Sequence, residues 1–434
     1  YGARRARSSG QGRSIGKMSG DYLGGIAGSG GSVLASNNSG TTWVSQNGVY
    51  WSDTTWSNSE SPNINIVGDI QIPSGVKLTI ESGVVVQFEG AYEILVKGAV
   101  VAVGTIAAPI TFQSNSPGVS TGETMFLYKG ADLSLSAFEY VKFKDSSSAI
   151  DIWGIDISIT GDISLKNSGT LTLKNMDLSN TDIRTLQHSY RAESKLLIEN
   201  SVMENVNLTT QYPWSYPIEV KDSTIKNSAM EQVMYGGYIK FTNVAATDTS
   251  FTFDSSISGA SNHTIESSTL INCPINAHGS LNITGSKLIG SRVYSNYHYG
   301  SLVVDNSVIT YTASDQYGVK VHGSLQMTSS TIQGPGEGVG LQVEGNNRSI
   351  TVDNVGFSGV EDAIRISGNF RGSDTFNVTN SNFWSANGYH ISNTSAKDIT
   401  ATGNYWGSSD ESAIKASIFD YLDNIDYGVV DYSG

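Results

Sequence analysis

One short pattern recurs along most of this chain, and it limits the folds that the chain can adopt. Apolar residues alternate with other residues, then a small polar pair follows, and a further apolar residue completes the unit, as in LLIENSVM from Leu196 and LVVDNSVI from Leu302. The pattern returns about every 23 residues. Copies begin at Leu171, Leu196, Ile218, Ile239, His263, Leu281, Leu302, Leu325, Ile350, Phe376 and Ile399.

Alternation of apolar residues is the period of a half-buried strand. The polar pair interrupts it, so each unit consists of short strands that meet at a bend. The unit has no long helical segment of the kind found in ankyrin or tetratricopeptide repeats. Stacked coils would bring equivalent residues about 4.8 Å apart. The sequence therefore predicts a rod of coils whose interior is a column of Leu, Ile, Val and Phe.

The first residue of the polar pair marks the bend. Asn tolerates left-handed backbone geometry, and stacked Asn side chains can hydrogen-bond along a column. We interpret this column as structural. Its members are Asn175, Asn200, Asp222, Asn243, Ser267, Gly285, Asn306, Ser329, Asn354, Asn380 and Gly403.

With its Asn column and its coil length, the chain resembles the right-handed parallel β-helix proteins of the pectate-lyase-like superfamily. Residues 70–110 resemble the opening coils of secreted β-helix surface proteins, and the segment from Gly403 is similar to their closing segment. There, a helix around Glu411–Phe419 and a strand at Val429–Tyr432 would cover the open end. The resemblance implies an all-β fold, a right-handed parallel β-helix, and says little about activity, because this fold hosts lyases, hydrolases, epimerases, adhesins and virion spikes.

We expect four regions. Residues 1–24 form a basic arm, 25–66 a small N-terminal β attachment region, 67–407 the parallel β-helix, and 408–434 a C-terminal cap. Within the second region, Ser36–Trp43 resembles one Asp-box of the sialidase-like propellers, with Asn38 in place of Asp. A propeller needs one copy per blade, so we expect an isolated hairpin.

The arm is rich in Gly and Ser and carries no acidic residue before Asp21. Because the whole chain has a formal net charge of −14, we expect the arm to support self-assembly or to bind a neighbouring structural subunit. A tail without a partner is the alternative. The basic residues are Arg4, Arg5, Arg7, Arg13 and Lys17.

Composition excludes several classes of protein. The single Cys273 rules out an internal disulfide and a cysteine-ligated metal centre. The negative charge argues against nucleic-acid binding, and the apolar stretch Ile94–Ile110 is interrupted by Lys97 and glycines, which argues against membrane insertion. No nucleotide or zinc signature is present, so we predict no cofactor and no metal. No secretory signal is visible, and we expect a mature or trimmed product.

Acidic residues alternate with threonine at the exposed position before the bend. Successive acids would be two coils, or about 9.6 Å, apart, which is near the carboxyl separation of an inverting glycosidase. Such a solvated face also avoids like charges on adjacent coils. A lyase would instead need a basic residue, for which Arg292 and Arg348 are candidates. The candidate catalytic acids are Glu266, Asp305 and Asp353.

Aromatic residues and histidines gather at two places. Three residues before the repeat lies a predicted column of His278, Tyr299, His322 and Asn347, close to Tyr294 and Tyr297. Sugar rings stack on such surfaces, although stacked turns would look the same. Two loops, 211–217 and 234–238, offer further rings for a glycan, a partner subunit or a local core. These rings are Tyr212, Trp214, Tyr216, Tyr235 and Tyr238.

Two functions remain open on these grounds. The favoured one is a structural, adhesive β-helix that assembles with neighbours, contacts glycans and is located outside the cell, at the cell surface or on a virion. The alternative is a polysaccharide-cleaving enzyme, such as a depolymerising spike, a glycoside hydrolase or a lyase.

Overall fold

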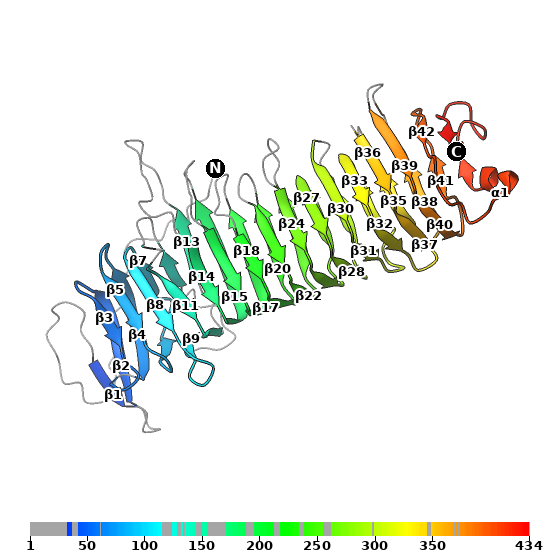
Figure 1. Cartoon of the computed structure of the whole chain (residues 1–434). Helices are drawn as coiled ribbons and strands as arrows, with labels where there is room; N and C mark the ends of the chain where they lie inside the picture. Colours follow the sequence, from blue (N-terminus) through cyan, green and yellow to red (C-terminus); the bar gives the residue numbers. More distant parts are fainter. Residues whose placement is uncertain are drawn as a thin grey trace, which may run out of the picture.

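The chain folds into an elongated rod of stacked coils, with its first described strands at one end and helix α1 at the other (Figure 1). This computed structural model confirms the predicted all-β parallel β-helix. It describes residues 33–36, 42–60, 62–114, 124–127, 132, 135–144, 150–154, 170–187, 195–211, 218–233, 238–254, 262–296, 299–344, 349–368, 370 and 374–433.

A typical coil contains three strands, β27 (Ser280–Thr284), β28 (Lys287–Ile289) and β29 (Val293–Ser295). Each pairs in parallel with the equivalent strand of the next coil, so the rod has three strips of sheet. We call the outer surfaces of these strips face 1, face 2 and face 3, in chain order.

Face 1 is the 16-stranded sheet. Besides β27 it contains β3 (Thr54–Trp56), β5 (Lys77–Ile80), β8 (Ala99–Val103), β11 (Ala137–Glu139), β14 (Thr170–Lys174), β16 (Lys195–Glu199), β18 (Ile218–Lys221), β21 (Ile239–Thr242), β24 (Asn262–Glu266), β30 (Ser301–Asp305), β33 (Ser324–Thr328), β36 (Ser349–Asp353), β39 (Thr375–Thr379), β42 (Ile399–Thr400) and β44 (Val430–Asp431).

Faces 2 and 3 belong to one 28-stranded sheet, because some long strands continue from one face to the other. These long strands are β2 (Thr42–Val49), β4 (Asn63–Ile72), β15 (Asp177–Gln187) and β17 (Val202–Gln211). Face 2 also contains β6 (Val85–Phe88), β9 (Ile110–Ser114), β12 (Val141–Lys144), β19 (Thr224–Lys226), β22 (Ala245–Thr247), β25 (Thr269–Ile271), β31 (Val308–Thr310), β34 (Thr331–Gln333), β37 (Gly356–Val360) and β40 (Asn382–Ala386). Face 3 also contains β7 (Glu93–Val96), β10 (Thr124–Leu127), β13 (Ile150–Gly154), β20 (Ala229–Val233), β23 (Ser250–Asp254), β26 (Ile275–His278), β32 (Tyr317–Val321), β35 (Val339–Val343), β38 (Asp362–Ile366), β41 (Ile391–Asn393) and β43 (Ile418–Phe419).

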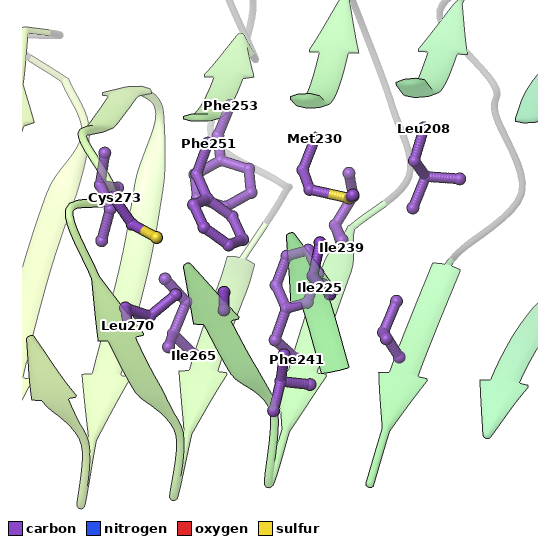
Figure 2. Packing of buried hydrophobic residues seen from close by; sticks show 14 of the residues in the cluster. Leu208, Ile225, Met230, Ile239, Phe241, Phe251, Phe253, Ile265, Leu270 and Cys273 are labelled. Atoms are coloured by element: carbon purple, nitrogen blue, oxygen red, sulfur yellow. The ribbon is translucent and has the colours of Figure 1, made fainter. Parts of the chain in front are cut away.

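The interior of the rod is a continuous apolar core. Leu281, Leu302 and Leu325 are register partners on successive coils and are fully or almost fully buried, as the repeat predicts. Aromatic residues pack in the same way, and Figure 2 shows Phe241 and Phe251 in contact inside the rod, with ring centroids 5.1 Å apart. Stacking of equivalent apolar side chains on successive coils removes apolar surface from water along the rod.

The predicted bend is confirmed at every position of the column, since all eleven residues have a positive φ. The amide of Asn243 donates to Asp222 Oδ1 at 2.6 Å. A second column, which the sequence analysis did not identify, lies at the next bend of the coil, where Asn227 and Asn272 also have positive φ.

A small polar side chain recurs directly after the first bend because it accepts a hydrogen bond from the neighbouring coil. The backbone N–H of Ser268 donates to Ser286 Oγ at 3.1 Å. The Ser286 hydroxyl in turn donates to the carbonyl of Thr284, two residues earlier in the same coil, at 3.0 Å. The hydroxyl therefore satisfies a buried N–H that the bend removes from strand pairing. Cys273 occupies the equivalent position at the second bend, where its N–H donates to Ser291 Oγ at 2.9 Å.

The two ends of the rod are closed differently. β1 (Val33–Ser36) pairs antiparallel with β2, with Ala35 opposite Trp43, and residues 37–41 between the two strands lie outside the described residues. Parallel pairing begins with β2 and β3, upstream of residue 67, where we placed the start of the β-helix. At the other end, α1 (Glu411–Ala416) and β44 form the cap.

Two expectations concern parts that the structure does not settle. The arm residues Arg4, Arg5, Arg7, Arg13 and Lys17 lie outside the described residues. In the described part of the chain, no helix is both long and apolar enough to cross a membrane.

Candidate functional site on face 3

Charged and aromatic side chains gather on face 3 where three neighbouring coils present β29, β32 and β35. Tyr294, Lys320 and Gln342 are partners in the strand register, so their side chains stand in one outward column. The next outward column contains His322 and Glu344, whose backbones also pair on adjacent coils. We call these residues, together with Arg292, Asp315 and Tyr317, the face-3 cluster.

Glu344 is the centre of the cluster. Its Oε2 lies 2.8 Å from Lys320 Nζ and 3.2 Å from His322 Nε2, and its Oε1 accepts a hydrogen bond from Gln342. Partial burial alone would raise the pKa of Glu344, but hydrogen bonds and charge from Lys320 and His322 outweigh it and hold the pKa below its ordinary value. Glu344 therefore fixes the position of two basic side chains.

Tyrosine rings lie beside the basic groups. Lys320 Nζ is 5.6 Å from the ring centroid of Tyr294 and 5.7 Å from that of Tyr317, so the ammonium interacts with both rings. Tyr294 also meets the ring of His322 edge-on, at 5.6 Å between centroids. The cluster thus offers both apolar ring surface and positive charge.

Arg292 adds a second cation at the side of the cluster. Its guanidinium lies 5.8 Å from the centroid of Tyr317, and Nη1 is 3.9 Å from Asp315 Oδ1. Its Nε is buried and has no hydrogen-bond partner among the described residues, and the same holds for Oδ1 of Asn296.

The structure brings together some of the residues predicted as an aromatic and histidine column, in a different order. His278 and His322 do lie two coils apart on face 3, but Asn296 lies between them, not Tyr299. Tyr299 lies on the bend before β30 and is 54% exposed. The difference arises because five residues separate β29 from β30, whereas one residue separates β26 from β27. Asn347 and Tyr297 lie outside the described residues.

The candidate acids form the expected column on face 1, since Asp305 pairs with Thr328 and Asp353 with Thr379 in the register. Thr328 Oγ1 donates to Asp305 at 2.5 Å, and Thr379 Oγ1 to Asp353 at 2.7 Å. Glu266 forms an ion pair with Lys240 at 2.9 Å. These contacts connect the acids along the sheet. Their part in catalysis stays a prediction, and Arg348 lies outside the described residues.

Of the aromatic loops, only Tyr238 is described. Its hydroxyl donates to Glu219 Oε1 at 3.3 Å, and burial together with this carboxylate raises the pKa of Tyr238. A role of the loop in glycan or partner binding stays a prediction. The others, Tyr212, Trp214, Tyr216 and Tyr235, lie outside the described residues.

Across the ranges that the structure describes, no three His, Cys, Asp or Glu side chains are grouped so that they could hold a metal ion. The face-3 cluster presents two cations, an imidazole, tyrosine rings and two carboxylates.

Sequence reasoning missed Lys320, Glu344 and Tyr317 and could not place Arg292. The number of residues between the second and third strands differs from coil to coil, since β28 ends at Ile289 and β29 begins at Val293, whereas β31 ends at Thr310 and β32 begins at Tyr317. Alternation within VYS and YGVKV marks these strands, but it does not say which outward residues match.

Neither a protein-family model nor a curated protein matches this sequence. Among solved structures, it is similar to a PL6 family polysaccharide lyase from Pseudopedobacter saltans, with 11% identity, a TM-score of 0.31, and coverage of 85% of this chain and 92% of that one. It is also similar to a mannuronic acid specific polysaccharide family 6 lyase from human gut microbiota, with 12% identity, a TM-score of 0.30, and coverage of 80% of this chain and 79% of that one.

Both similar structures are enzymes that cleave polysaccharides, and both are parallel β-helix proteins. The order of the two functions in the sequence analysis was therefore wrong. The similarity to these lyases favours the alternative, a polysaccharide-cleaving enzyme, over the structural, adhesive function.

Proposed function

We propose that this chain cleaves an acidic, uronate-containing polysaccharide by β-elimination at the face-3 cluster. The observation that carries the proposal is the grouping of Arg292, Lys320 and His322 on neighbouring coils beside tyrosine rings. In a chain with a formal net charge of −14, such a group is a local site of attraction for an anionic polymer. The rings of Tyr294 and Tyr317 supply apolar surface against which a sugar ring can pack.

Elimination requires three functions from the side chains. A cation must neutralise the uronate carboxylate, a base must remove the proton from the adjacent carbon, and an acid must protonate the leaving oxygen. Arg292 suits the first function, because the planar guanidinium matches a carboxylate and the Arg292 side chain is 39% exposed.

His322 and Tyr294 suit the other two functions. Imidazole is the most common general base. Glu344 holds the ring of His322 in one orientation, as a carboxylate does for the histidine base of a catalytic triad. Tyr294 lies edge-on against that ring, and its hydroxyl is our candidate acid for the leaving oxygen. Lys320 adds positive charge between the two tyrosine rings.

Hydrolysis fits the cluster less well. A glycoside hydrolase needs two carboxyl groups, one of which stays protonated through a raised pKa. The two carboxylates here, Glu344 and Asp315, each face a cation, and the pKa of Glu344 is lowered, which is opposite to what a general acid requires.

The test is to incubate the full chain with alginate, polygalacturonate and, as a neutral control, xylan. Ultraviolet absorbance reports unsaturated uronates, and a reducing-end assay reports every cleavage. We expect both signals with at least one polyuronate and neither with xylan. His322→Gln and Arg292→Ala should each lower the rate about 100-fold or more, whereas Asp305→Asn on face 1 should not.

Three outcomes would contradict the proposal. Reducing ends without absorbance would indicate hydrolysis, and no product from any polyuronate would exclude cleavage of these substrates. Loss of product in Asp305→Asn, with His322→Gln unchanged, would move the site to face 1.

The basic arm supports a separate proposal on partners, from the sequence alone. It carries five basic residues in a chain whose formal net charge is −14. We therefore propose that the arm binds an acidic surface of a neighbouring copy outside the cell. Deleting residues 1–20 should weaken assembly at low salt and have less effect at high salt. Unchanged sedimentation of the shortened chain would reject this.

A further inference from the structure

A hollow lies at the C-terminal end of the rod, where the cap meets the last coil. Its volume is about 650 Å³, which is within the usual range for small-molecule sites. The walls come from the bend around Tyr405, from α1, and from β44 with the residues that follow it.

Aromatic residues form one side of the hollow. Trp406 is almost fully buried and stacks on Phe383, with ring centroids 4.9 Å apart, and Tyr432 meets Trp406 edge-on at 6.3 Å. This packing fixes the wall. Tyr405 is 52% exposed and presents its ring to solvent.

Acceptor oxygens line the same hollow. Asp431 Oδ1 accepts hydrogen bonds from the N–H and Oγ of Ser433, and Glu411 pairs with Lys415 at 2.8 Å. Both carboxylates are lining groups, so the hollow disfavours an anionic sugar and offers acceptors to sugar hydroxyls.

A further exposed ring lies on the neighbouring coil. Trp384 sits where the register of β40 shifts, at a β-bulge, and its side chain is 58% exposed. A bulge re-aims a side chain, and here the indole lies against Gly356, where an added Cβ would be 3.2 Å from Cζ3. Asn382, two residues earlier, is bridged to Tyr405, so the two exposed rings lie on adjacent coils of face 2.

We propose that the C-terminal hollow binds a neutral sugar unit of a glycan. The ring of Tyr405 packs against the apolar face of the sugar, and Glu411 and Asp431 accept hydrogen bonds from its hydroxyls. The glycan continues over Trp384, which binds the next part of the chain. This is a binding site separate from the face-3 cluster, and it takes an uncharged ligand instead of a uronate.

The test uses the full chain and calorimetric titration with cellohexaose, mannohexaose, laminarihexaose and an oligogalacturonate. We expect at least one neutral hexaose to bind, and Tyr405→Ala to weaken it about tenfold. Trp384→Ala should weaken the hexaose more than the matching disaccharide. Trp51→Ala removes another exposed indole, 70% accessible, at the other end of the rod and should have no effect.

The two proposals can fail separately. Elimination activity of Tyr405→Ala should equal that of the parent chain, because the residue is not in the face-3 cluster. If no neutral hexaose binds, or if Tyr405→Ala and Trp51→Ala behave alike, the sugar site is refuted whatever the outcome for polyuronates. Circular dichroism of each variant checks that the coils are intact.

Discussion

Glu344 and Lys320 lie on neighbouring coils of face 3, and the carboxylate Oε2 is 2.8 Å from the ammonium Nζ. The same oxygen is 3.2 Å from His322 Nε2. A single carboxylate therefore orients the proposed base and a cation beside it. We regard Glu344 as a positioning residue, because in the proposed reaction it touches His322 and not the substrate.

Replacing Glu344 with Gln should lower kcat on a polyuronate about tenfold or more and change KM little, because the base loses its fixed orientation. Glu344→Asp should restore part of the activity. The pKa of Glu344 is held below its ordinary value, so the parent chain should keep this interaction in mildly acid solution. Steady-state kinetics as a function of pH provide the measurement, and an unchanged kcat in Glu344→Gln would refute the positioning role.

The buried side chain of His263 should make the stability of the fold sensitive to acid. It is fully buried, its ring stacks on Phe253 at 4.7 Å, and its Nδ1 accepts the N–H of Ile239. Burial lowers its pKa from 6.5 to about 4. The unfolded chain therefore binds the extra proton first, and stability that is present above about pH 6.5 is lost as the pH falls towards 4.

The size of this effect is about 3 kcal/mol, at about 1.4 kcal/mol per pKa unit. In His263→Leu, the free energy of unfolding should fall much less between pH 7 and pH 4 than in the parent chain. His390, whose pKa is also lowered by burial, accounts for a smaller fall that remains. The variant also loses the acceptor for the N–H of Ile239, which lowers its stability at every pH. The measurement is therefore the slope of the free energy of unfolding against pH, from urea unfolding at each pH. Parallel slopes for the two chains would contradict the prediction.

Ser286 tests the buried column after the first bend. Ser286→Ala leaves the N–H of Ser268 buried without its acceptor, so the free energy of unfolding should fall by about 1–3 kcal/mol. Ser314→Ala removes an exposed hydroxyl and is the matched control. Thermal unfolding of both variants gives the comparison, and equal melting temperatures would show that the column contributes little.

Asn306 tests the backbone geometry of the bend. Its φ is 46°, and the coil before it has Gly285 at the same place with φ 59°. Asn306→Ala should cost about 1–2 kcal/mol, because alanine lacks the side-chain amide whose local hydrogen bonds offset the cost of the left-handed region. Asn306→Gly should cost less, since glycine accepts this geometry. If alanine were tolerated better than glycine in urea unfolding, the strain argument would be wrong.

Much of the fold could be predicted because its signals are local. Alternation over five residues identifies strands such as β27 and β30, and Asn306 or Gly285 after them identifies the bend. The repeat then aligns Leu281 with Leu302, since residues of equal position in the unit must stack. The second bend was missed because its residues, such as Asn227 and Asn272, follow strands of only three residues.

The sequence by itself determined the coil, its bends and the buried columns, because these depend on a pattern that repeats within each unit. Only the tertiary structure decided that Tyr294, Lys320 and Glu344 meet on face 3 and that Asp305 lies elsewhere on face 1. Side chains on the outside are matched by the lengths of the connections between strands, which vary from coil to coil. Contact between them is therefore a property of the stacked rod and not of any one repeat.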